Sequence, residues 1–294
     1  MSNQEVTLLD DGIAASRYDK WKDRDPFPSI KPALLNSRDI IHYVTATGMI
    51  CPFRNKKDGE DKLKTASYEV DIGDEYLWWD DEGKKQTKKL IPGESFVLKK
   101  NSIMFVKVEP NFRLPSYIAL RFNLRITHVY RGLLLGTGPL IDPEYVGPLF
   151  IPLHNLTDND YTLESGEGLI WVEFTKLSPA REWLQPGTIS PERPEVEVYK
   201  FPPAKKEKDL NYFIRRAEPH RPIRSSIPVE VARARKAAEE AKRQAWYVTI
   251  AAIALLLTIL AFVIAAMNFV NSRAGNLEQK LDSAEIRLNR LEKR

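Results

Sequence analysis

The side chains that could do chemistry gather in residues 137–153, TGPLIDPEYVGPLFIPL, of this 294-residue chain. Gly138-Pro139 and Asp142-Pro143 are turn formers, because proline presets φ and glycine tolerates positive φ. The turn presents a carboxylate, Asp142, and a phenol, Tyr145, ahead of a stretch in which apolar residues alternate with others. The sequence therefore predicts a turn that carries candidate ligand-binding groups, followed by a half-buried strand.

Other sources of reactivity are scarce. The four histidines show no metal-ligand spacing, and neither a glycine-rich phosphate loop nor a Ser or Cys nucleophile motif is present. Cys51 is the only cysteine, which excludes an intramolecular disulfide and a Cys-rich metal site. We expect no metal centre. The net charge of +4 is too small to indicate nucleic acid binding, and the N-terminus lacks the pattern of a cleavable secretion signal.

The elements that must position the turn are strands. Short alternating stretches such as Tyr68, Val70 and Ile72 recur at spacings of roughly ten residues, separated by Gly- and Pro-containing turns. A short helix precedes them, capped by Asn36 or Ser37. No βαβ rhythm appears, so we predict a mainly β domain over residues 34–178, a β-barrel or distorted jelly roll with a short N-terminal helix.

A membrane span is expected near the C-terminus. Residues 247–270 form 24 consecutive residues without a charge, about 36 Å as a helix against a hydrocarbon core of about 30 Å. Trp246 and Tyr247 stand where interfacial aromatic residues stand. The alternative, a buried core helix, would need a shell of other helices that the sequence does not predict. We therefore expect a single-pass membrane protein.

The flanking segments complete the predicted organisation. Residues 1–33 are expected to be an N-terminal arm, either mobile or draped over a neighbouring subunit. Residues 179–227 form a Pro-rich basic linker, because proline at this density opposes helix and sheet interiors. Residues 228–246 should form a juxtamembrane helix. Lys and Arg are more frequent before the span than after it, which places the β domain in the cytoplasm and the tail on the opposite side.

The tail, residues 271–294, has a heptad pattern. Its apolar residues follow one another at spacings of 4, 3, 4 and 3: Leu277, Leu281, Ala284, Leu288 and Leu291. This is the a/d stripe of a coiled coil. The alternative is an amphipathic helix on the membrane surface. The basic residues before the span should attract anionic lipid headgroups.

The turn also resembles the "T-A-G-x-I-D-P-x-Y-x-G" signature of the trimeric dUTPase/dCTP deaminase family. Two earlier segments, residues 65–73 (TASYEVDIG) and residues 90–98 (LIPGESFVL), resemble other motifs of dCTP deaminases in particular. The resemblance implies a distorted jelly roll, a homotrimer and a nucleotide pocket at this turn. Asp142 matches the aspartate that binds the sugar 3′-hydroxyl and orients a hydrolytic water. Tyr145 matches the aromatic residue under the deoxyribose, and Gly138 matches a glycine of the same turn.

The family's phosphate-binding segment matches residues 125–132, RITHVYRG. Arg125 is retained, Thr127 stands at a serine position, and Arg131 lies next to the position of the family's second arginine. Ile126 replaces a serine whose hydroxyl donates to phosphate, and an apolar side chain cannot do this. The resemblance therefore implies a nucleotide-binding set in which the affinity for phosphate is reduced.

Other catalytic positions depart from the family. Pro152 stands where deaminases carry the general acid/base glutamate, and proline cannot transfer a proton. His154 is two residues further on, either a substitute or a histidine at the pocket rim. Trp171 replaces a glutamine that helps to place phosphate or water, and Asp71 replaces a basic residue. The C-terminal segment that closes over the triphosphate is not recognisable.

Three functions remain open. The favoured one is a membrane-anchored protein of the dUTPase fold that has lost deaminase activity and acts as an oligomeric nucleotide-binding or assembly module. The second is an active dUTP- or dCTP-processing hydrolase that uses Asp142. The third is a nucleotide-sensing membrane effector. The expected partners are further copies of the chain, the bilayer and a nucleotide. Mg²⁺ would enter only with a nucleotide triphosphate, and no other cofactor is indicated.

Overall fold

The computed structural model describes residues 5–80, 82–135, 140–178, 199, 201–203, 208–217 and 222–291. They fall into two compact units, Met1–Ser225 and Ser226–Arg294, which are described separately. The helices are α1 (Asp11–Trp21), α2 (Ser37–Thr47), α3 (Ile126–Tyr130), α4 (Leu210–Ala217) and α5 (Ile227–Leu291).

The strands are β1 (Thr7–Leu8), β2 (Ile50–Cys51), β3 (Phe53–Arg54), β4 (Lys56–Lys57), β5 (Glu60–Asp61), β6 (Tyr68–Trp79), β7 (Lys85–Lys89), β8 (Ser95–Leu98), β9 (Ser102–Arg113), β10 (Ile118–Leu124), β11 (Leu133–Leu135), β12 (Leu140–Ile141), β13 (Val146–Asn155), β14 (Tyr161–Glu164) and β15 (Gly168–Lys176).

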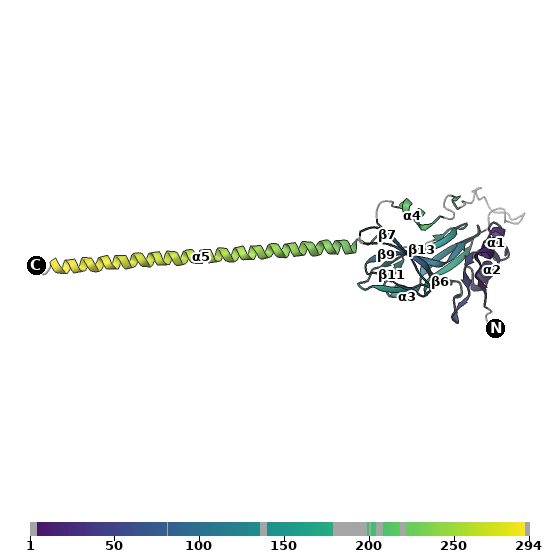
Figure 1. Cartoon of the computed structure of the whole chain (residues 1–294), viewed down its shortest axis with the longest axis horizontal. Helices are drawn as coiled ribbons and strands as arrows, with labels where there is room; N and C mark the ends of the chain where they lie inside the picture. The colour runs from purple at the N-terminus through teal and green to yellow at the C-terminus, as the bar shows by residue number, and fades with distance from the viewer. Residues whose placement is uncertain are drawn as a thin grey trace, which may run out of the picture. The chain divides into compact units, whose positions relative to one another are not determined.

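Among these residues the largest sheet has nine strands. Its order is β11-β13-β9-β6-β15-β10-β12, with β2 added to β9 and β7 added to β6, and all of its pairings are antiparallel. The sheet curls into a half-barrel (Figure 1). The pair β8–β14 forms a separate short ribbon. The mainly β fold predicted from the alternating stretches is confirmed.

The core lies on the inner face of this sheet. In β13, Leu149, Ile151 and Leu153 are buried, whereas Phe150 and Pro152 between them are half-buried. This alternation is what a strand with one face against the core requires, because successive side chains point to opposite faces. The predicted strand after the turn is therefore confirmed in both its location and its buried face.

The N-terminal helices pack beside the sheet (Figure 1). Asn36 caps α2, since its Oδ1 accepts from Asp39 N at 3.0 Å, as predicted. Gly48 ends α2 at φ +64°, and a Cβ there would lie 2.2 Å from Ala14 O of α1. Helix α1 corrects the expectation of a mobile arm at this end of the chain: Ala14 is fully buried because the two helices approach this closely.

The Pro-rich linker also contains structure that the sequence did not suggest. Helix α4 lies within the proline-free stretch of residues 204–218, so proline does not interrupt it. Most of residues 179–207, the first part of the predicted linker, lie outside the described residues.

The second unit is the single helix α5. It runs without a break through the predicted juxtamembrane and span segments and into the tail as far as Leu291, and its apolar window is not buried by any described residue. In the described part of the chain, this is the one helix long and apolar enough to cross a membrane.

Candidate functional site

The turn that carries Asp142 and Tyr145 lies between β12 and β13. Its backbone is held to the end of β9, because Leu114 N donates to Tyr145 O and Glu144 N donates to Leu114 O, each at 2.9 Å. The Tyr145 hydroxyl donates to Pro148 O at 2.7 Å, and burial raises the pKa of Tyr145 to about 12. Tyr145 is therefore a neutral, fixed ring at pH 7. Gly138 lies outside the described residues.

A cavity of about 320 Å³ opens beside this turn. Asp142 and Tyr145 form one side of it, and Phe201, Lys208 and residues of α4 form the other. Phe201 meets Tyr145 edge-on, with ring centroids 6.2 Å apart. The cavity at this turn is therefore walled by a segment from more than 50 residues further along the chain.

These additional wall residues were missed by sequence reasoning. From α4 they include Leu210 and Phe213, which follow helical spacing, with Arg215 and Arg216 on other positions of the helix. This amphipathic pattern was the signal that could have identified α4. It was missed because the prolines on either side of it favoured a linker without helices.

The predicted phosphate-binding residues lie on and around α3. Arg125 stands at the N-cap of α3, where its guanidinium is 3.6 Å from Glu69 Oε1 on β6. Thr127 is exposed on the same short helix. Arg131 follows the helix and donates to the Tyr161 hydroxyl at 3.2 Å, with its guanidinium 5.8 Å from the centre of that ring.

A buried hydrogen-bond chain supports this helix. His128 is 1% exposed, with Nε2 2.8 Å from Gly168 O and Nδ1 3.1 Å from the Tyr161 hydroxyl. Because a carbonyl oxygen only accepts, Nε2 carries a proton, and in the neutral imidazole Nδ1 then accepts from the Tyr161 hydroxyl. Arg131 donates to the same hydroxyl, so the chain runs Arg131–Tyr161–His128–Gly168. His128 therefore positions Arg131 and α3, a role that histidine spacing alone did not indicate.

An ionic network lies beneath Arg125. Asp71, whose side chain is 2% exposed, is bound by Lys57 at 2.8 Å and by Lys62. Lys62 also pairs with Glu69 at 3.0 Å. The acidic residue that replaces a basic one in the family motif is thus neutralised by two lysines from the segment of β4 and β5. Burial of this carboxylate is tolerated because both of its oxygens are paired.

The two predicted halves of the site are far apart within one chain. Leu120 of β10 pairs with Ile141, so Asp142 lies beside Ala119, whereas Arg125 follows the last residue of β10. Six residues of strand separate them, about 20 Å at roughly 3.3 Å per residue. One protomer does not bring Asp142 and Arg125 together.

The positions that depart from the family pattern lie within strands. Pro152 pairs with Phe105 and His154 pairs with Ile103, both in the β13–β9 ladder. Burial lowers the pKa of His154, so its imidazole is more readily neutral than a free one. Trp171 is half-buried in the centre of β15, with Lys64 Nζ 5.7 Å from its ring.

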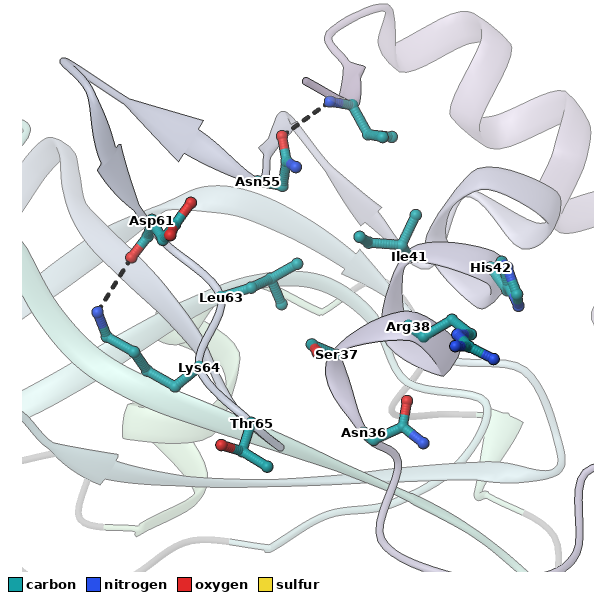
Figure 2. A pocket seen from close by; sticks show the side chains of 11 residues that line it. Asn36, Ser37, Arg38, Ile41, His42, Asn55, Asp61, Leu63, Lys64 and Thr65 are labelled. Atoms are coloured by element: carbon teal, nitrogen blue, oxygen red, sulfur yellow. Dashed lines mark hydrogen bonds between the residues drawn. The ribbon is translucent and has the colours of Figure 1, made fainter. Parts of the chain in front are cut away.

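A larger, open groove of about 990 Å³ lies between the start of α2 and the β4–β5 hairpin (Figure 2). Arg38, His42 and Lys64 line it, together with Asn55 and Asp61. Asn55 accepts from Val6 N at 2.8 Å and Lys64 donates to Asp61 O at 3.2 Å. None of the predicted site residues lines this groove. Among the described residues, no cluster of three or more His, Cys, Asp or Glu side chains could hold a metal ion.

Comparison with solved structures gives three examples of similar proteins. The dCTP deaminase of Agrobacterium tumefaciens is 15% identical, with a TM-score of 0.40 over 50% of this chain and 49% of that one. The EIAV dUTPase is 14% identical, with a TM-score of 0.27 over 39% and 98%. A mutant dUTPase from phage phi11 of S. aureus is 15% identical, with a TM-score of 0.29 over 50% and 94%.

The chain thus spans about half the length of that deaminase. No curated protein sequence matches it. A family model described as dCTP deaminase-like matches residues 34–177, which include the strands β2 to β15. Residues 34–177 are therefore a dCTP deaminase-like domain.

Proposed function

We propose that this protein is a membrane-anchored nucleotide-binding or assembly module that has lost deaminase activity. The observation that carries the proposal is the cavity beside Asp142 and Tyr145. Its sugar-facing pair is retained, whereas the adjacent strand carries Pro152 where the proton-transferring glutamate of deaminases would stand. A proline has no ionisable group, so the ligand is bound but not deaminated.

The chemistry of the cavity suits a nucleotide. The Asp142 carboxylate accepts hydrogen bonds from a ribose hydroxyl, and the Tyr145 ring packs under the sugar. Lys208 lines the same cavity and supplies a positive charge for a phosphate. Because Tyr145 is held through its bond to Pro148 O, the ring is fixed before the ligand arrives.

A second copy of the chain would complete the site. Arg125 lies about 20 Å from Asp142 along one protomer, beyond the length of a nucleotide sugar and its first phosphate. In a homotrimer, which the family resemblance implies, α3 of one protomer can approach the turn of the next. Self-association is then a requirement for full affinity.

The test is calorimetric titration of the full-length protein, solubilised in detergent, with dUTP, dCTP and cyclic nucleotides. We expect Asp142→Asn to weaken binding by about tenfold or more, because a charged hydrogen bond contributes roughly 1.5–3 kcal/mol. Asp158→Asn is the matched control, since Asp158 is exposed on the β13–β14 loop outside this cavity. Absence of binding for every nucleotide refutes the nucleotide-binding function.

The second candidate is an active hydrolase, favoured by the retention of Asp142. It is distinguished by incubating the same protein with dUTP or dCTP, with and without Mg²⁺, and by following diphosphate release. Turnover that Asp142→Asn abolishes and Asp158→Asn leaves unchanged would replace the binding function by an enzymatic one. In the third candidate, a sensor, nucleotide binding would alter the packing of the helices in the bilayer.

Membrane anchoring by α5 belongs to the same proposal. With more Lys and Arg before the span than after it, the dCTP deaminase-like domain would be cytoplasmic and the tail would lie on the opposite side. The basic residues of the preceding helical segment, among them Arg233, Arg235 and Lys236, would bind anionic headgroups. Protection of the head, but not the tail, from protease in sealed inverted vesicles would contradict this orientation.

A further inference from the structure

The C-terminal part of α5 leaves an apolar stripe uncovered. Leu277 is 60% exposed and Leu281 is 68% exposed, and Ala284 continues the row with spacings of 4 and 3. In heptad notation Leu277 is a d position, Leu281 an a position and Ala284 the next d position. In the sequence the same register continues to Leu288 and Leu291.

The residues that flank this stripe carry one sign of charge on each side. The g positions are Arg273 and Lys280, and the e positions are Glu278 and Glu285. In the sequence the next g position is again basic and the next e position again acidic: Arg287 and Glu292. In a coiled coil, e and g residues form the interhelical salt bridges that set partner choice and orientation.

These charges have no opposite charge at helical spacing on their own helix. Residues three and four positions from Arg273, Glu278, Lys280 and Glu285 are apolar, uncharged or of the same sign. Arg273 contacts the Phe269 ring at 5.3 Å, and in the described part of the helix none of the four forms an ion pair. Their arrangement therefore gains no intrahelical stabilisation of the kind that an i,i+4 pair would give.

We propose that this stripe is a self-association surface, which joins further copies of the same chain in a parallel, in-register coiled coil. In that arrangement each g residue meets the e residue five positions later on the neighbouring helix. Arg273 then faces Glu278 and Lys280 faces Glu285, in both directions around the assembly. An antiparallel arrangement would instead place g beside g and e beside e, where every contact is between like charges.

The inference adds a partner and an orientation to the proposed assembly. Parallel, in-register tails require every chain to cross the bilayer in the same direction, so it rests on the proposed membrane anchoring. The pattern begins at Arg273, three residues after the predicted span ends at Val270. The tail would therefore hold the spans together at the membrane surface from which it emerges.

The first test reverses charges in the full-length protein in detergent micelles. Lys280→Glu places Glu beside Glu285 of every neighbour, and we expect it to weaken association about tenfold or more, as measured by the concentration dependence of sedimentation. Adding Glu285→Lys restores opposite charges and should restore the affinity. Lys280 and Glu285 are five residues apart, about 140° around the helix, so this rescue cannot act within one chain.

A matched control separates the stripe from general charge effects. Asp282→Lys changes an acidic residue at a b position, which points away from the seam, by the same two charge units as Glu285→Lys. We expect Asp282→Lys to leave association unchanged and Glu285→Lys alone to weaken it. Equal effects of these two variants, or no rescue in the Lys280→Glu/Glu285→Lys protein, would overturn the proposal.

The second test reports orientation directly. In a Cys51→Ser background, which removes the single buried thiol, Ala284→Cys places thiols at facing d positions of neighbouring helices. Mild oxidation should cross-link Ala284→Cys and not Ser283→Cys, which is one residue away at an outward c position. Equal cross-linking, or tails that remain separate and bind liposomes as single helices, would exclude the parallel seam.

Failure here is distinguishable from failure of the proposed nucleotide binding. The charge and cysteine variants all lie in α5, whereas Asp142 and the cavity belong to the other unit. A protein that binds nucleotide but does not respond to Lys280→Glu refutes the tail proposal alone.

Discussion

Replacing Lys176 with Met should strongly destabilise the dCTP deaminase-like domain. Lys176 is the last residue of β15, and its side chain is 4% exposed. Its ammonium lies 2.5 Å from Asp25 Oδ2 and donates to Phe27 O at 3.0 Å and to Ile30 O. The Asp25 side chain is 6% exposed, and its other oxygen accepts from the Tyr43 hydroxyl at 2.9 Å. This ion pair fastens residues 25–30 to the sheet.

The expected magnitude follows from burial. Asp25 Oδ2 accepts no hydrogen bond of good geometry, so its contact with Lys176 is mainly ionic. Removing one partner of a buried pair costs about 3–5 kcal/mol, because the other charge is left without compensation. At about 2–4 °C per kcal/mol for a domain of this size, the melting temperature should fall by roughly 6–20 °C.

The assay is thermal unfolding of the full-length protein in detergent, followed by tryptophan fluorescence. Lys22→Met is the matched control, because Lys22 pairs with Asp19 at 3.0 Å but the two side chains are 43% and 70% exposed. An exposed pair contributes about 0–1 kcal/mol, so the control should unfold close to the unmodified protein. If Lys176→Met is no more destabilising than Lys22→Met, the buried ion pair does not fasten the N-terminal segment.

Three further predictions concern other contacts of the domain. Gly48→Ala should lower the free energy of unfolding by about 2–4 kcal/mol, because it adds a Cβ 2.2 Å from Ala14 O at a positive φ. Unfolding in denaturant measures this loss, and an unchanged midpoint would contradict the packing of α1 on α2. Tyr161→Phe should cost about 1–3 kcal/mol, because buried His128 Nδ1 loses its donor, and an unperturbed His128 imidazole resonance in NMR spectra would contradict this. Burial lowers the pKa of His154, so the unfolded state binds a proton more readily than the folded state, and the free energy of unfolding should fall as the pH drops below about 6.5. His154→Gln should remove that part of the pH dependence. An identical dependence of the free energy of unfolding on pH in both proteins would refute this.

Much of the fold follows from local patterns in the sequence. The alternation of Leu149, Ile151 and Leu153 predicted the strand and its buried face, because a strand with one side in the core must alternate. Asn36 predicted the start of α2, because its side chain can accept from the backbone amide three residues later. The uncharged stretch after Trp246 predicted one long helix, since nothing in it interrupts helical hydrogen bonding.

Other features could not be read from such patterns, because they depend on residues that are distant in the chain. The sequence of helix α1 has only a weak amphipathic pattern, and the position of this helix depends on the close contact between Ala14 and Gly48 at the end of α2. Asp71 departs from the family motif, and only the tertiary structure shows the two lysines that neutralise its buried carboxylate.

The candidate site shows the same division. The sequence by itself determined that Asp142 and Tyr145 stand at a turn that leads into a strand, because proline presets φ and alternating apolar residues mark the strand. Only the tertiary structure decided that α4 and Phe201 wall the cavity beside them. Only strand pairing decided that Arg125 lies at the far end of β10, because register is a property of two chain segments and not of one.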